Sequence, residues 1–260
     1  MGGLQAFELR RQEACYTGRF AAIGVDAYGA LRPYAEGILH ADEMRYFAPL
    51  PAERRRVSFL LGRYAAKRAL GPCLGGPAFA DINIMPGIFK QPVVGHPMRE
   101  PWQVSITHSD AMVCAIAFPT VHPMALDVET IDAQRVPAMA TVCQDSERTE
   151  ALALGLDLPT ASTMLWTAKE ALSKTLHTGM TCPFEWFEVH ALRRIAGTEF
   201  EGLYKHLGQY KFHAWIGGDC VLTMTLPRRT DLVFDTGQPC LPSSNLGPGA
   251  PTNAPAGGRP

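Results

Sequence analysis

The sequence predicts an α/β (α+β) fold of two similar subdomains, each a helix packed on a small antiparallel sheet. Residues 66–70 and 168–172 spell AKRAL and AKEAL, which differ at one position, and both lie within runs of strong helix formers. A strand, a tight turn and a second strand are predicted after each helix, at 103–118 and at 210–226. A helix followed by a hairpin therefore occurs twice at nearly the same spacing, which indicates two related halves.

The two predicted halves meet at His122 and Pro123. We expect a ligand cleft between them, in a pseudo-twofold arrangement, because small-molecule sites often lie at such boundaries. The end of the chain is rich in Pro and Gly, a composition that buries too little apolar area to offset the entropy of ordering. The predicted division is an N-terminal extension at 1–9, a first subdomain at 10–122, a second subdomain at 123–230 and a disordered tail at 231–260.

Two carboxylates lie on one face of a predicted strand in the second half. Along residues 124–129, Leu126 and Val128 are apolar, while Asp127 and Glu129 alternate with them and point the other way. Two residues along a strand are about 7 Å apart, so both carboxylates can reach one hard cation. Oxygen ligands are what Mg²⁺ prefers. The strand therefore offers two candidate ligands for one metal ion.

A helix with the sequence WTAKEALSK follows at 166–174. Glu170 and Lys174 are four residues apart on it and share one face, so a carboxylate and an ammonium lie side by side. Taken alone, an Asp-x-Glu strand is usually a polar face, and a Glu-x-x-x-Lys helix usually carries a surface ion pair. Their joint occurrence in this order indicates chemistry on a metal-bound phosphate.

With these motifs the chain resembles the 4′-phosphopantetheinyl transferase superfamily, of the surfactin-synthetase-activating (Sfp) type. Its signatures are a Gly-[Ile/Val]-Asp-x-Glu strand and a [Trp/Phe]-[Ser/Thr/Cys]-x-Lys-Glu-[Ala/Ser]-x-x-Lys helix. Residues 166–174 match the helix throughout, and 125–129 match the strand with Ala125 in place of the usual Gly. Segments similar to the upstream motifs of the family are VSITHS at 104–109, GRYAAKRAL at 62–70 and FKQP at 89–92.

The resemblance implies a holo-[acyl-carrier-protein] synthase type of transferase. It would move the 4′-phosphopantetheine arm of coenzyme A to a serine of an apo acyl, aryl or peptidyl carrier protein and release adenosine 3′,5′-bisphosphate. It also implies Mg²⁺, with Mn²⁺ as an alternative, held by Asp127, Glu129 and Glu170. Glu170 is the first candidate for the general base and Glu129 the second, while Lys174 would neutralise a phosphate. The pathway served, whether fatty acid, polyketide or nonribosomal peptide biosynthesis, stays open.

Coenzyme A would lie mainly on the first half in this interpretation. The residues expected to bind it are Arg63, Lys67, Lys90, Ser105, Thr107, His108 and Lys174. The metal site, the catalytic helix and the carrier-docking surface would belong to the second half. The apolar segment at 178–187 is the expected docking wall.

Composition limits the other functions of the chain. Lys and Arg number 24 against 25 Asp and Glu, so a broad surface for nucleic acid is not expected. The 7 cysteines form no Cys-x-x-Cys pair, which argues against a disulfide framework. We found no signal sequence and no apolar run long enough for a membrane span, and we expect a cytoplasmic monomer.

Two alternative functions remain at this point. A metal-dependent phosphodiesterase or nuclease would use the same carboxylates with water in place of serine. A non-catalytic relative would still bind coenzyme A or a carrier protein, and Ala125 is the one departure that favours it.

Overall fold

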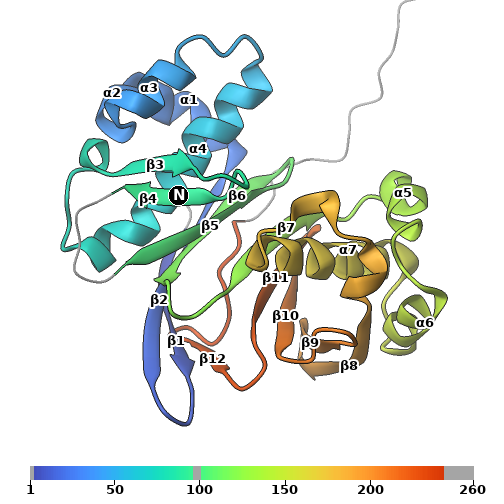
Figure 1. The fold of residues 1–260 in the computed structure, drawn as a ribbon. Coiled ribbons are helices and arrows are strands. Elements are labelled where there is room, and N and C mark those ends of the chain that lie inside the picture. Colours follow the sequence, from blue (N-terminus) through green and yellow to red (C-terminus); the bar gives the residue numbers. More distant parts are fainter. Residues whose placement is uncertain (1–2, 96–100, 243–260) are drawn as a thin grey trace, which may run out of the picture.

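Two antiparallel five-stranded sheets lie between two long helices (Figure 1). The computed structural model describes residues 3–95 and 101–242. The first sheet has the order β12-β1-β2-β6-β5. Its strands are β1 (Leu4–Arg10), β2 (Cys15–Gly24), β5 (Trp102–His108), β6 (Met112–Pro119) and β12 (Asp231–Phe234).

The second sheet has the order β7-β11-β10-β9-β8. Its strands are β7 (Ala125–Thr130), β8 (Val189–Ala196), β9 (Glu199–Tyr204), β10 (Tyr210–Gly217) and β11 (Cys220–Pro227). The two predicted hairpins are confirmed as β5–β6 and β10–β11, and the predicted carboxylate strand is β7.

One long helix covers the outer face of each sheet. Helix α4 (Glu53–Leu70) packs on β2, β5 and β6, and α7 (Leu158–Thr175) packs on β7 and β11. The shorter helices lie beside them in Figure 1. They are α1 (Tyr28–Leu31), α2 (Ala35–Ile38), α3 (Ala41–Phe47), α5 (Val136–Ala140) and α6 (Asp145–Ala153).

Strand β6 shows how the layers are built. Val113 and Ala115 face α4, whereas Cys114 and Ile116 face the second sheet, because successive side chains of a strand point to opposite faces. Three apolar cores result: one under α4, one between the sheets and one under α7. The molecule is therefore a stack of helix, sheet, sheet and helix, which is the predicted mixed fold.

The two halves repeat the same order of elements. The first half runs from β2 through short helices and α4 to the hairpin β3 (Asn83–Pro86) and β4 (Pro92–Gly95), and then to β5 and β6. The second half runs from β7 through α5, α6 and α7 to β8, β9, β10 and β11. β2 pairs with β6 as β7 pairs with β11, so the predicted two similar subdomains are confirmed.

Each long helix carries one fully buried lysine, and the two lysines make matching contacts. Lys67 of α4 forms an ion pair with Glu43 and donates to the Ile38 carbonyl at 2.8 Å. Lys169 of α7 lies 2.8 Å from a carboxylate oxygen of Glu147. Both lysine side chains are 0% exposed, and such charges persist inside a protein only when they are paired and hydrogen-bonded.

The two partner glutamates are also equivalent. Glu43 accepts from the main-chain N–H of His40 at 2.9 Å and of Ile84 at 3.0 Å. Glu147 accepts from the corresponding groups of Gln144 at 2.6 Å and Val189 at 2.7 Å. Each glutamate thus connects the start of a short helix, the long helix and the strand that follows. The predicted contact of Lys67 with coenzyme A is corrected accordingly, because its ammonium is enclosed in this structural cluster.

The predicted ends of the domains need correction. Residues 1–9 are not an extension, because β1 is an inner strand of the first sheet. The predicted tail begins too early, since β12 pairs with β1 and Phe234 is buried between the sheets. Gln5 donates to the Gln238 carbonyl at 3.0 Å and accepts from the Cys240 N–H at 2.6 Å. The prediction for residues 243–260 lies outside the described residues.

The linker between the halves lies where the sequence places it, between Pro119 at the end of β6 and Ala125 at the start of β7. Within residues 3–95 and 101–242, no helix is both long and apolar enough to cross a membrane.

Candidate functional site

Strand β7 and helix α7 bring the predicted acidic residues together. Asp127 and Glu129 project from the face of β7 that α7 covers, while Leu126 and Val128 fill the core between the sheets. Glu170 and Lys174 lie on α7. A hollow of about 460 Å³ is lined by Asp127, Glu129, Glu170, Lys174, Thr107, His108, Ile106 and Trp166.

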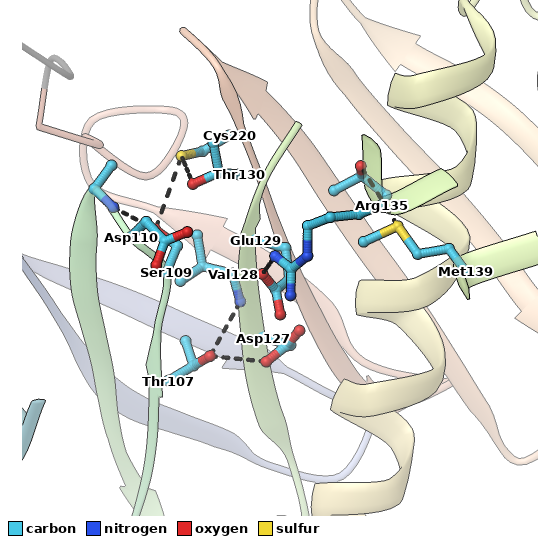
Figure 2. Close-up of polar contacts among 12 residues, drawn as sticks. Thr107, Ser109, Asp110, Asp127, Val128, Glu129, Thr130, Arg135, Met139 and Cys220 are labelled. Carbon is cyan, nitrogen blue, oxygen red and sulfur yellow. Dashed lines mark hydrogen bonds and ion pairs between the residues drawn. The ribbon is translucent and has the colours of Figure 1, made fainter. Parts of the chain in front are cut away.

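Asp127 is held on one oxygen and left open on the other. Its Oδ1 accepts from the Thr107 hydroxyl at 2.7 Å and from the Lys174 ammonium at 2.6 Å. Figure 2 shows the first of these contacts, between β5 and β7. Its Oδ2 is buried and has no hydrogen-bond partner among the described residues. A buried carboxylate oxygen without a partner is costly, so this atom is suited to a cation.

Glu129 is turned toward Arg135, whose guanidinium donates to it at 2.6 Å (Figure 2). Arg135 ends a short 3₁₀ turn after β7. The pKa of Glu129 is raised above its ordinary value, first by burial and then by the charge of Asp127, against the effect of Arg135 and Lys174. A positive charge added nearby would favour the ionised carboxylate and lower the pKa of Glu129 again.

Glu170 also has an open oxygen. Its Oε1 is buried without a hydrogen-bond partner in the described part of the chain. Burial and then the Asp127 charge raise the pKa of Glu170, while Lys174 acts in the opposite direction. A carboxylate with a raised pKa binds a proton more readily than an ordinary surface glutamate.

These carboxylates fit a divalent cation, although they are not yet arranged around one. Across residues 3–95 and 101–242, no group of three or more His, Cys, Asp or Glu side chains forms a ready metal site. The reason is visible in the contacts: Arg135 draws Glu129 aside and Lys174 occupies Asp127. The open oxygens of Asp127 and Glu170, and the mutual repulsion of the three carboxylates, are what a bound cation would satisfy.

Ser105 and Thr107 join the two halves. Strands β5 and β7 belong to different sheets, and the Ser105 hydroxyl accepts from the Leu126 N–H at 3.3 Å. The Thr107 hydroxyl accepts from the Val128 N–H at 3.2 Å, as Figure 2 shows. Both side chains were predicted to bind coenzyme A. In the structure both hydroxyls instead accept hydrogen bonds from the main chain of β7, the strand that carries Asp127. The sequence did not indicate this role.

A basic hollow of about 730 Å³ adjoins the acidic one on the first half. Arg63, Lys90 and His108, all predicted to bind coenzyme A, line it together. The Arg63 guanidinium lies 4.6 Å from the centre of the Phe59 ring, and its Nε is 3.1 Å from Glu43. These contacts hold the arginine in one orientation at the wall of the hollow.

Two further cations of this hollow, Arg54 and Arg55, were missed by sequence reasoning. Arg54 is exposed and lies 3.1 Å from Asp110. The available signal was the run of three arginines at 54–56, in the first turns of α4. Such runs are usually only solvated, so they do not stand out without the fold.

A third hollow of about 400 Å³ connects the others. It is lined by Lys90 and Ser105 from the first half and by Lys174 and His177 from the second. Ile106 lines all three hollows, and His108 lines the basic and the acidic one. A continuous cleft therefore runs between the subdomains from a basic end to an acidic end.

The predicted docking wall at 178–187 lies next to this cleft. Phe184 stacks on Trp166 with ring centres 5.8 Å apart, and Trp166 lines the acidic hollow. Trp186 is exposed, but Phe187 is buried in the core under α7. Part of the segment is therefore core, and part is free to meet another molecule.

The chain belongs to the 4′-phosphopantetheinyl transferase superfamily, whose model matches residues 123–225. Holo-[acyl-carrier-protein] synthases from strains of Streptococcus agalactiae serotypes III and V are 37% identical to it over 93 residues. The match spans 32% of this chain and 74% of each relative. Membership supports transfer of phosphopantetheine to a carrier protein as the class of reaction, while assignment to the Sfp type stays a prediction.

Solved structures with some similarity carry related descriptions. A holo-(acyl-carrier-protein) synthase from Bacillus anthracis in complex with CoA (3′,5′-ADP) aligns with a TM-score of 0.37 and 21% identity, over 43% of this chain and 96% of that chain. The Holo-ACP-synthase from Plasmodium yoelii aligns with a TM-score of 0.35 and 18% identity, over 38% and 90%.

Proposed function

We propose that this protein transfers the 4′-phosphopantetheine arm of coenzyme A to a serine of an apo carrier protein and releases adenosine 3′,5′-bisphosphate. The observation that carries the proposal is the continuous cleft between the subdomains, basic at one end and acidic at the other. Coenzyme A has the same polarity, with a phosphorylated nucleoside at one end and a pyrophosphate in the middle. The similarity to holo-[acyl-carrier-protein] synthases supports a carrier protein as the acceptor.

The basic end would hold the nucleoside phosphate. Arg63 is fixed there by Phe59 and Glu43, and Lys90 and His108 line the same hollow. A guanidinium matches phosphate with two parallel hydrogen bonds, and an ammonium adds a point charge. Lys174 lines both the acidic and the connecting hollow. Its ammonium would therefore contact the pyrophosphate once the ion pair between Lys174 and Asp127 has opened.

Asp127, Glu129 and Glu170 would hold Mg²⁺, or Mn²⁺ in its place. A bound divalent ion supplies positive charge to the phosphates and to the departing oxygen. The open oxygens of Asp127 and Glu170 support this assignment, and Glu129 would complete the set after release from Arg135.

The carrier serine has to lose a proton as it attacks. Its hydroxyl oxygen would form a bond to the β-phosphorus while the bond from that phosphorus to the bridging oxygen breaks. The hydroxyl proton would pass to Glu170, whose raised pKa suits a base, and the bridging oxygen leaves on the α-phosphate of the bisphosphate product. Glu129 is the second candidate for the base.

Mass spectrometry of apo carrier proteins tests the proposal. A panel of acyl and peptidyl carrier proteins is incubated with the protein, coenzyme A and Mg²⁺, and a gain of one phosphopantetheine group is expected on at least one of them. A parallel sample omits the carrier protein. No gain on any carrier would contradict the proposal, and release of phosphopantetheine without a carrier would indicate a hydrolase instead.

A further inference from the structure

A second cavity lies away from the acidic and basic cleft. It has a volume of about 1000 Å³ and shares none of its lining residues with the three hollows described above. Its walls come from the β1–β2 turn, the linker between the halves, the β9–β10 turn and the β11–β12 turn. Both subdomains therefore contribute to it.

The charge of this cavity is positive. Arg11, Arg228 and Arg229 line it against one carboxylate, Glu13, which is 2.8 Å from the Arg11 guanidinium. The pKa of Glu13 is lowered chiefly by the hydrogen bond from Arg11, and Arg229 adds a smaller effect in the same direction. One acidic group thus faces three guanidinium groups.

Two of these arginines have free side chains on a fixed backbone. The main chain of Arg228 donates to the Gln209 carbonyl at 2.8 Å, and Thr230 closes the turn by donating to Pro227 at 3.1 Å. The side chains of Arg228 and Arg229 are exposed and make no hydrogen bond or ion pair with any residue of 3–95 or 101–242. Two main-chain hydrogen bonds therefore hold the turn, while its guanidinium groups are available.

A buried histidine, His122, lies at the same place. Its ring lies 2.9 Å from the Thr230 hydroxyl through Nε2, and that hydroxyl also accepts from Arg11 at 3.2 Å. The Thr230 hydroxyl has two acceptor lone pairs, so it can either donate to Nε2 or accept from it. Burial and then the Arg11 charge lower the pKa of His122 to about 4, against the effect of its own backbone, so the ring is neutral at pH 7.

The Nδ1 atom of His122 has no hydrogen-bond partner in the described structure, although the residue is only 1% exposed. A buried polar nitrogen without a hydrogen-bond partner is costly. His122 lines the same cavity as the free guanidinium groups.

We propose that this cavity binds a small phosphorylated molecule, held by Arg228 and Arg229 beside the His122 ring. Guanidinium groups match phosphate oxygens bidentately, so two of them can hold one phosphate group. The rings of Tyr16 and Tyr210 supply flat apolar walls for the rest of the ligand. The volume is in the range of ordinary small-molecule sites. The inference does not depend on the proposed transferase reaction.

Calorimetry with inorganic pyrophosphate tests the site, with a chelator present to remove divalent metal. We expect the double variant Arg228→Ala/Arg229→Ala to lose a binding event that the wild type shows, with a Kd at least about tenfold higher. Lys90→Ala removes a cation of the proposed coenzyme A site and should keep that event. Arg32→Ala is the matched control for an exposed arginine elsewhere. Equal binding by the double variant and the wild type would overturn the proposal.

The His122 side chain gives a second readout. Its ring nitrogen resonances should move when pyrophosphate is added to the wild type, and they should stay unchanged in the double variant. Binding that leaves these resonances unmoved in the wild type would place the anion outside the cavity and contradict the proposal. Citrate that binds as tightly as pyrophosphate would contradict the preference for phosphate.

Discussion

The two subdomains share one frame and carry opposite chemistry. In the hairpins, Ala115 of β6 corresponds to Thr223 of β11, and their partners on the neighbouring strands are Ala21 and Asp127. By the same register, Ile23 of the first half stands where the second half has Glu129.

The helices differ in the same way. Where the second half has Glu170, directly after the buried Lys169, the first half has Arg68, directly after Lys67. The lysine and its glutamate partner are kept in both halves, whereas the three carboxylates of the acidic hollow have no counterpart in the first half. The comparison therefore separates the residues that stabilise the common fold from the residues that line the candidate site.

The largest effect is expected from Glu170→Ala. It should lower the transfer rate by about 10²- to 10⁴-fold, the range for loss of a positioned proton acceptor, while the thermal unfolding midpoint stays within a few degrees. Arg68→Ala changes the corresponding position of the first half and should cost far less. Glu36→Gln is the control for an exposed carboxylate. Transfer assays on all three variants test this prediction. Wild-type activity of Glu170→Ala would show that this residue does not belong to the site.

The buried lysines come next. Lys169→Met leaves the buried Glu147 without its cation, and the free energy of unfolding should fall by about 3–5 kcal/mol. Lys67→Met should cost less, because the Arg63 guanidinium stays 3.1 Å from Glu43. Urea unfolding measures both losses. Replacing lysine and glutamate together, as in Lys169→Met/Glu147→Leu, should recover part of the loss. A large cost in one half and none in the other would show that the two clusters are not equivalent.

A smaller effect is expected from Thr107→Val. This variant removes the hydrogen bond to Asp127, and loss of a residue that positions a metal ligand typically costs about 10- to 100-fold in activity or metal affinity. Ser105→Ala breaks the neighbouring contact between β5 and β7 but leaves Asp127 untouched, so it should change the rate less. The Mg²⁺ concentration for half-maximal transfer should rise only in Thr107→Val. Equal behaviour of both variants would mean that the threonine serves only to join the halves.

The smallest effect concerns pH. Glu201 of β9 accepts from Arg193 at 3.0 Å and Lys211 at 2.9 Å, and its pKa lies far below the ordinary 4.5, chiefly because of His213, whose Nε2 lies 3.2 Å from its carboxylate. A lowered pKa in the folded state stabilises the protein above the unfolded pKa, and this stability is lost as the pH falls below about 4.5. His213 corresponds to the uncharged Ser105 in the first half.

Unfolding titrations between pH 7 and pH 3 measure this contribution. Glu201→Gln should flatten the acid limb of the stability curve, and Ser105→Ala should leave it unchanged. An unaltered acid limb in Glu201→Gln would show that this network does not account for the pH dependence.

Much of the site followed from sequence because its signals are local. Asp127 and Glu129 alternate on one strand, and Glu170 and Lys174 share a helix face, so periodicity alone aligns each pair. The helix and hairpin that occur twice in the sequence likewise placed the linker near His122. These predictions needed no knowledge of how the sheets pack.

The rest depended on distant partners. Lys67 was taken for a ligand-binding residue because nothing near it in the sequence shows that Glu43 will enclose it. The hydroxyl of Thr107 finds Asp127 across two sheets, and Arg135 finds Glu129 only after the chain turns beyond β7. β1 does alternate, with Phe7 and Leu9 buried, but its second neighbour β12 lies at the far end of the described chain.

The pairing of β12 with β1 joins the end of the described chain to the first sheet. The chain begins in the first subdomain, builds the whole of the second, and then returns to lay its last strand on the edge of the first sheet. The first subdomain is therefore discontinuous, and a fragment that stops at residue 122 lacks its edge strand and exposes the backbone of β1. The first half therefore cannot be inherited or exchanged as one contiguous segment, whereas the second half, from β7 to β11, is contiguous.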